Sequence, residues 1–171
     1  LQAAQVLRQA MEQRSDDIML RTQRAVNEFG LGRRDDAISE LSLVFDTRPE
    51  LSNAGATLIV MLLRERDYEA AVAGARELLL RVPDNLSYIN LLGAAAFEKG
   101  DHEMGRWAFD LALAIDPEFY PARTNLAELL LREGKVDLAR GHLERVLDTE
   151  PDAIPALMLL ARSYESEGDL E

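Results

Sequence analysis

The apolar positions along this chain follow a helical pattern rather than a strand pattern. Alternation of Val, Ile and Thr with polar residues, which marks a half-buried strand, is missing throughout. Ala and Leu are plentiful, as are Arg and Glu, and all four residue types favour helix. Apolar residues make up 47% of the chain and charged residues 29%, which is enough to bury a core. The sequence therefore predicts an all-α protein.

Prolines mark a repeat in the sequence. Four of them follow one another at a spacing of 34 residues: Pro49, Pro83, Pro117 and Pro151. A proline pushes the residue before it out of the helical region, so each of these prolines is expected to end a helix. A period of 34 residues is typical of a unit of two helices joined by a turn.

A second landmark falls in phase with the prolines. A turn glycine precedes a small residue by five positions in three units, and in another unit arginine takes the place of the glycine. The pairs are Gly32 and Ala37, Arg66 and Ala71, Gly100 and Gly105, and Gly134 and Ala139. Glycine at such a turn supplies the left-handed backbone that closes a helix without a Cβ clash. Arginine in the same geometry would be strained by about 1 kcal/mol.

With these landmarks the sequence resembles the tetratricopeptide repeat family over its whole length. The resemblance implies a right-handed solenoid of antiparallel helix hairpins, a single array over residues 1–171. The full repeats would be residues 18–51, 52–85, 86–119 and 120–153. A half repeat stands at each end: 1–17 matches a second helix, and 154–171 matches a first helix and its turn. The landmarks of the half repeats are Ala3, Leu7, Ala10, Leu157, Leu160, Ala161, Tyr164 and Gly168. Because Leu1 falls inside a repeat, we expect the chain to be part of a longer protein.

The first helix of the first full repeat fits this frame badly. Strict phase places Arg24 and Glu28 at packing positions. Ala25, Val26 and Phe29 lie one residue along and would pack better. We expect a local adjustment of register in this helix.

No set of residues in the sequence has the pattern of a catalytic, cofactor or metal site. His102 and His142 are 40 residues apart in different repeats, and both are expected to be solvated surface side chains. The acidic pairs Asp16–Asp17 and Asp35–Asp36 stand at predicted helix starts, where carboxylates cap N–H groups. No phosphate-binding loop, dinucleotide fingerprint or nucleophile elbow occurs. We therefore expect no catalytic residue, no cofactor and no metal.

Charge and hydropathy exclude two kinds of partner. The net charge is −12, and no cluster of Lys and Arg forms the basic stripe that a general nucleic-acid binder needs. The longest unbroken apolar run, Leu58–Leu63, is far shorter than the roughly 20 residues of a membrane span. We expect neither nucleic-acid binding nor membrane insertion by this fragment.

The resemblance also implies where a partner binds. In the family, first helices line the concave side of the solenoid, and ligands contact defined positions of each repeat. At those positions stand Asn53, Thr57, Val60, Leu63, Arg64, Asn90, Leu91, Ala94, Phe97, Thr124, Asn125, Glu128, Leu131 and Arg132, with Glu98, Met158 and Arg162 beside them. We expect Phe97 and Leu63 to anchor an apolar peptide or helix, the alternative being that such residues pack between neighbouring helices. Trp107, the only tryptophan, either covers a junction between repeats or anchors a second contact.

A finer resemblance concerns residues 114–129 and 143–147. They are similar to the long bacterial tetratricopeptide lipoproteins that accompany exopolysaccharide and exosortase (PEP-CTERM) loci. This implies a scaffold for polysaccharide export or protein sorting on the periplasmic side of the cell envelope; without this resemblance the cytoplasm is the expected location. Two alternatives to a peptide-binding scaffold stay open: self-assembly through the open array ends or the convex face, and a regulatory arm of a larger enzyme such as a glycosyltransferase.

Overall fold

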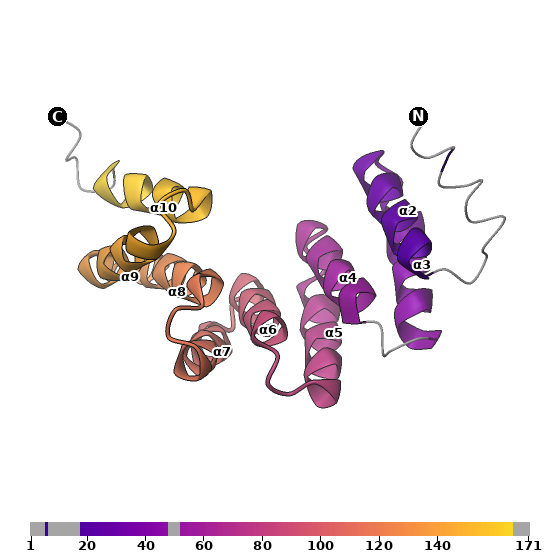
Figure 1. The fold of residues 1–171 in the computed structure, drawn as a ribbon, viewed down its shortest axis with the longest axis horizontal. Coiled ribbons are helices and arrows are strands. Elements are labelled where there is room, and N and C mark those ends of the chain that lie inside the picture. The colour runs from indigo at the N-terminus through magenta and orange to yellow at the C-terminus, as the bar shows by residue number, and fades with distance from the viewer. Residues whose placement is uncertain (1–5, 7–17, 48–51, 166–171) are drawn as a thin grey trace. The chain divides into compact units, whose positions relative to one another are not determined.

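The computed structural model describes residues 6, 18–47 and 52–165 of the chain, and these ranges form helices and no strand. The helices are α2 (Ile18–Gly30), α3 (Arg34–Thr47), α4 (Ser52–Arg64), α5 (Tyr68–Arg81), α6 (Leu86–Lys99), α7 (His102–Ile115), α8 (Tyr120–Arg132), α9 (Val136–Thr149) and α10 (Ile154–Glu165) (Figure 1). Consecutive helices pack in pairs as hairpins, which confirms the predicted all-α array of tetratricopeptide-type hairpins. The expected landmarks Ala3, Leu7, Ala10, Asp16, Asp17, Pro49 and Gly168 lie outside the described residues.

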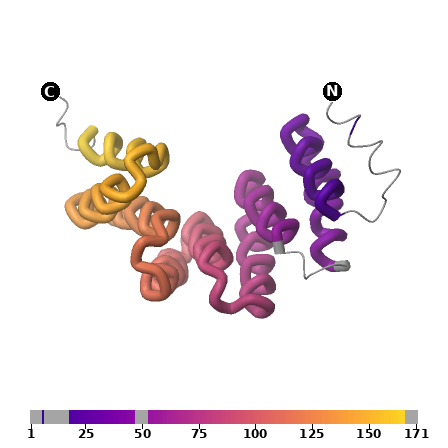
Figure 2. Tube along the Cα trace, in the orientation of Figure 1, coloured from indigo at the N-terminus to yellow at the C-terminus, as the bar shows by residue number. Residues whose placement is uncertain are grey.

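The chain divides into two compact units, Leu1–Pro83 and Asp84–Glu171. In the first unit α2 pairs with α3 and α4 pairs with α5, and α3 packs against α4. In the second unit α6 pairs with α7 and α8 pairs with α9, and α10 packs against α9 and α8. Figure 2 shows the chain reversing direction at the turn inside each hairpin. The division of the whole chain into four full repeats and two halves of a single array stays a prediction.

The turns inside the hairpins have the predicted left-handed backbone. Gly32, Gly100 and Gly134 have φ angles of 86°, 95° and 75°. Arg66 takes the same conformation with φ 63°, and it is the non-glycine residue of the described chain with positive φ. The condition for strain at this position, an arginine in the backbone geometry of the turn glycines, is met. The turn at Arg66 therefore keeps the hairpin shape at the cost of backbone strain.

The residues before the prolines leave the helical conformation, as predicted. Val82 has φ −134° and ψ 81°, Asp116 has φ −134° and ψ 102°, and Glu150 has φ −128° and ψ 75°. Each of these residues follows directly on the last residue of a second helix. The prolines therefore fix where the second helices end and where the chain turns to the next hairpin.

Small residues let the two helices of a hairpin approach closely. A Cβ built on Gly93 of α6 would lie 2.5 Å from Cε1 of Phe109 on α7, too close for real atoms. Phe109 is fully buried, and Ala108 and Ala112 on the same helix are buried as well. The ring of Phe109 thus occupies the space that the missing side chain of Gly93 leaves.

In the first helix of the first full repeat Ala25 is buried as expected, at 1% exposure, but Val26 and Phe29 are not buried, so the expected shift of packing from Glu28 to these two residues is wrong. Glu28 is buried, with 7% of its surface exposed, while Val26 is 39% exposed. The Glu28 carboxylate accepts a hydrogen bond from Arg33 Nη1 at 2.5 Å. A buried carboxylate is costly unless it is paired. Because Arg33 supplies that partner, α2 tolerates a charged residue at a packing position.

Candidate functional site

The first helices of the second unit, α6, α8 and α10, lie next to one another. The middle helix, α8, packs against both of the others. Residues three or four apart on a helix share a face, so the predicted binding positions of each helix form one strip. We call these side chains the first-helix face: Asn90, Leu91, Ala94 and Glu98 of α6, Asn125, Glu128, Leu131 and Arg132 of α8, and Met158 and Arg162 of α10.

Two asparagines pair across this face. The Nδ2 group of Asn125 donates a hydrogen bond to Oδ1 of Asn90 at 2.8 Å. Both side chains are half-buried. The Nδ2 group of Asn90 and Oδ1 of Asn125 form no hydrogen bond within the described ranges. The pair therefore presents one donor group and one acceptor that are open to a partner.

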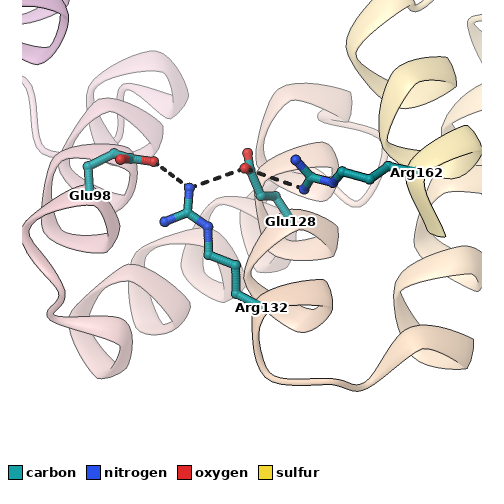
Figure 3. Close-up of polar contacts among 4 residues, drawn as sticks. All are labelled: Glu98, Glu128, Arg132 and Arg162. Atoms are coloured by element: carbon teal, nitrogen blue, oxygen red, sulfur yellow. Dashed lines mark hydrogen bonds and ion pairs between the residues drawn. The ribbon is translucent and has the colours of Figure 1, made fainter. Parts of the chain in front are cut away.

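A chain of ion pairs runs along the same face. Nη2 of Arg132 lies 2.9 Å from Oε1 of Glu98 on α6 and 3.2 Å from Oε1 of Glu128 on its own helix. Nη2 of Arg162 on α10 lies 3.6 Å from the same Glu128 oxygen. Figure 3 shows the four side chains in this order, coming from three helices. Burial alone would lower the pKa of Arg132, but Glu98 and Glu128 together raise it. The ion pairs thus hold the Arg132 guanidinium charged and fixed in position.

Phe97 is a core residue, which corrects the expectation that it anchors a partner. It is 4% exposed. The start of its side chain packs closely against Gly105 on α7: a Cβ added to this glycine would lie only 3.1 Å from the Cβ of Phe97. The ring of His102 lies 5.4 Å away, and the guanidinium of Arg132 covers the ring face at 4.2 Å from its centre. Thr124 is likewise buried, at 6% exposure, because its helix packs between α6 and α10. Neither side chain is exposed to a partner.

A pocket of about 320 Å³ opens at the end of the ion-pair chain. Its lining residues are Glu128, Leu131, Arg132, Val136, Arg162 and Ser163. Val136 begins α9, and Ser163 is buried on α10. Sequence reasoning missed both, because they stand outside the family's ligand positions. Val136 and Ser163 lie close together because α9 packs against α10, and the sequence does not show this packing.

The remaining predicted residues lie on α4 in the first unit. Asn53, Val60 and Arg64 are exposed, and Thr57 and Leu63 are half-buried. The Thr57 hydroxyl donates to the backbone oxygen of Asn53 at 2.8 Å, so it is satisfied by its own helix. The role of these residues in binding stays a prediction.

The two histidines differ in environment. His102 is exposed, as expected, but His142 is half-buried and its Nδ1 atom is buried without a hydrogen-bond partner. Burial lowers the pKa of His142, and the positive charges of Arg123 and Arg145 lower it further against the opposing effect of Asp110. The expectation of a solvated His142 is therefore wrong, because α9 turns this side chain toward the neighbouring helices.

The described ranges contain no group of three or more His, Cys, Asp or Glu placed to hold a metal ion. Among their helices, none is both long enough and apolar enough to cross a membrane.

Trp107 on α7 is 57% exposed, so most of its surface is open to solvent.

Two family models described as Tetratricopeptide repeat match the sequence, one at residues 96–163 and the other at residues 61–118. Together they extend from the end of α4 into α10 and include every residue of the first-helix face. No curated protein matches the chain in sequence.

Several solved structures are similar to the chain. MamA from Desulfovibrio magneticus is 22% identical with a TM-score of 0.71, over 89% of this chain and 86% of MamA. A thermophilic TPR protein of Thermus thermophilus is 22% identical with a TM-score of 0.76, over 88% of this chain and 82% of its own. YrrB, described as a TPR protein with an unusual peptide-binding site, is 15% identical with a TM-score of 0.64, over 98% of this chain and 87% of its own. At these identities the similarity shows the fold alone.

Proposed function

This chain is a tetratricopeptide repeat protein, and we propose that it is a non-catalytic scaffold whose first-helix face binds an extended segment of a partner protein. The observation that carries the proposal is the Asn90–Asn125 pair, with its open donor and acceptor on adjacent helices. Every peptide unit of an extended segment offers one C=O and, proline apart, one N–H. The asparagine pair is therefore complementary to the backbone of such a segment.

The surroundings of the pair suit the side chains of a bound segment. Leu91, Ala94 and Leu131 are half-buried, and Met158 is 68% exposed. Apolar surface of this kind receives alternate side chains of an extended peptide, while the backbone is held by hydrogen bonds. The peptide-binding site named for YrrB supports the same role for a protein of this fold. We extend the proposal to Asn53, Val60, Leu63 and Arg64 on α4, which stand at the equivalent positions of their repeat.

Selection from a library of short random peptides tests the proposal. The selected peptides should bind Asn125→Ala and Asn90→Ala about tenfold more weakly, because each variant removes a hydrogen bond and leaves a group unpaired. Asn27→Ala is a matched control, since Asn27 is also half-buried but lies on α2 in the first unit. Unfolding midpoints of all three variants should stay close to that of the unmodified protein. Peptides that bind both asparagine variants and the control alike would contradict the proposal.

We also propose a place to search for the natural partner. The similarity of residues 114–129 and 143–147 to lipoproteins of polysaccharide export and protein-sorting loci is the observation that supports it. The family and structural matches name no such system, so the proposal rests on these stretches alone. Genes of polymer export or exosortase type next to the gene of this protein would support it, and a neighbourhood without them would count against it.

Self-assembly is a second candidate, supported by exposed apolar side chains of the second unit. Trp107 is 57% exposed, Leu138 is 61% exposed and Ile154 is 67% exposed. Exposed apolar side chains mark a contact between proteins where they form a contiguous patch. Light scattering over a concentration series distinguishes the two candidates. A mass that rises with concentration, and falls back in Trp107→Ser, would favour self-assembly.

A further inference from the structure

Arg132 and Arg162 converge on a single carboxylate. Their Nη2 atoms lie 3.2 Å and 3.6 Å from Oε1 of Glu128 (Figure 3). Arg132 also donates to Glu98 at 2.9 Å, while the side chain of Arg162 forms no other ion pair or hydrogen bond with the described residues. A guanidinium group carries five N–H donors. Most of the donors of this arginine pair are therefore open.

Glu128 occupies the pair only weakly. The side chains of Arg132 and Arg162 are 42% and 54% exposed, so water and salt screen their attraction to Glu128. The 3.6 Å contact with Arg162 is too long for a good hydrogen bond. A carboxylate that approached the two guanidiniums in plane would form better hydrogen bonds than Glu128 does.

The pocket beside the pair has the chemistry of an acidic side chain. Its walls include the apolar side chains of Leu131 and Val136 together with both guanidiniums. The methylene groups of a glutamate or aspartate would pack against the apolar wall, and the carboxylate would face the arginines. The volume of about 320 Å³ leaves room for one side chain of this size.

Arg132 is already positioned for such a ligand. Its guanidinium lies over the buried ring of Phe97, 4.2 Å from the ring centre, and is held by Glu98. An arginine fixed in this way loses less freedom when it binds a carboxylate. A basic side chain, in contrast, would be repelled by the two guanidiniums. It would also find no free carboxylate, because Glu98 and Glu128 are already paired with the arginines.

From these contacts we infer that the partner segment carries an acidic side chain, Asp or Glu, that binds between Arg132 and Arg162 and displaces Glu128. The inference rests on the proposed function, since the same segment contacts the asparagine pair on α6 and α8. Glu128 then acts as an internal competitor that occupies the arginines when no partner is bound.

The test uses random peptides embedded within a display protein, so that neither peptide end is free and only side chains supply a carboxylate. Peptides selected on the unmodified protein should be enriched in Asp and Glu. Glu128→Gln should bind them about fivefold more tightly, because the competing charge is gone, and Arg162→Gln about fivefold more weakly. Replacing the selected acidic residue by its amide should abolish both effects.

Matched controls lie within the same unit. Glu144→Gln and Arg145→Gln change the same charges on α9, a second helix, and should leave peptide affinity unchanged. Enrichment of Lys and Arg, weaker binding to Glu128→Gln, or equal binding to Arg162→Gln would overturn the inference. If the peptides still depend on Asn90 and Asn125, the proposed function survives that result. A library that yields no binder overturns both.

Discussion

The guanidinium of Arg132 on α8 covers the ring of Phe97 on α6, with 4.2 Å between the guanidinium carbon and the ring centre. The ring belongs to the core, at 4% exposure, and the arginine side chain is 42% exposed. A cation over an aromatic face contributes about 0.5–1 kcal/mol at a partly exposed site. The core of one hairpin therefore orients a charged group that the next hairpin presents on its surface.

Phe97→Ala should lower the free energy of unfolding by about 3–5 kcal/mol, as expected for a truncated core aromatic. The reason is the cavity left by the ring, which packs against His102 of α7 and lies under the Arg132 guanidinium. Denaturant unfolding measures the change. Leu80→Ala is the control, because Leu80 is 84% exposed and its truncation should change stability by no more than about 0.5 kcal/mol. A small change in Phe97→Ala would show that the ring is not part of the core.

Arg66→Gly should stabilise the protein by about 0.5–1 kcal/mol, because glycine adopts a φ of 63° without strain. Replacing arginine by glycine within a helix should change the stability in the opposite direction. Arg76→Gly, in the middle of α5, should destabilise by about 1 kcal/mol. Both values follow from thermal or urea unfolding. Destabilisation by Arg66→Gly would mean that the arginine side chain stabilises the turn by more than the backbone strain costs.

Gly93→Ala and Gly141→Ala should also differ in sign. A Cβ at Gly93 would lie 2.5 Å from Phe109, whereas nothing lies within 4 Å of a Cβ at Gly141. Overpacking at Gly93 should destabilise by about 1–3 kcal/mol. Alanine at Gly141, within α9 and exposed, should stabilise by about 0.5–1 kcal/mol through its higher helix propensity. Equal effects at the two positions would contradict the close approach of α6 to α7.

Stability should fall as the pH drops below about 6.5, the ordinary pKa of histidine. Burial, followed by Arg123, lowers the pKa of His142 in the folded protein. At higher pH this histidine is neutral in both the folded and the unfolded chain. As the pH falls, the unfolded chain takes up the proton first, and the folded state loses relative stability. Urea midpoints at about pH 7.5 and about pH 5.5 measure the loss above the range where most carboxylates titrate.

His142→Gln should reduce this pH dependence, and His102→Gln, which replaces an exposed histidine of the same unit, is the matched control. The groups that face His142 are Asp110 on α7, Arg123 on α8 and Arg145 on its own helix. If both variants keep the pH dependence of the unmodified protein, another group causes it.

The candidate site was only partly predictable. The spacing of Asn90, Asn125 and Glu128 in the repeat placed them on first helices, and the structure joins them on one face. Phe97 stands at a position of the same frame, yet its ring is buried against His102 of α7 and under Arg132 of α8. The frame specifies a position along a helix, but the direction of a large ring depends on whether a neighbour leaves space for it.

The sequence by itself determined the helices, the turns and their spacing, because these depend on local chemistry. Glycine or a strained arginine closes each hairpin, and proline forces the residue before it out of the helix. Only the tertiary structure decided which side chains are buried and which charges meet. Arg132 meets Glu98 because α8 packs against α6, and Arg162 meets Glu128 because α10 packs against α8. Such contacts join separate helices, so they depend on packing that no local pattern of residues encodes.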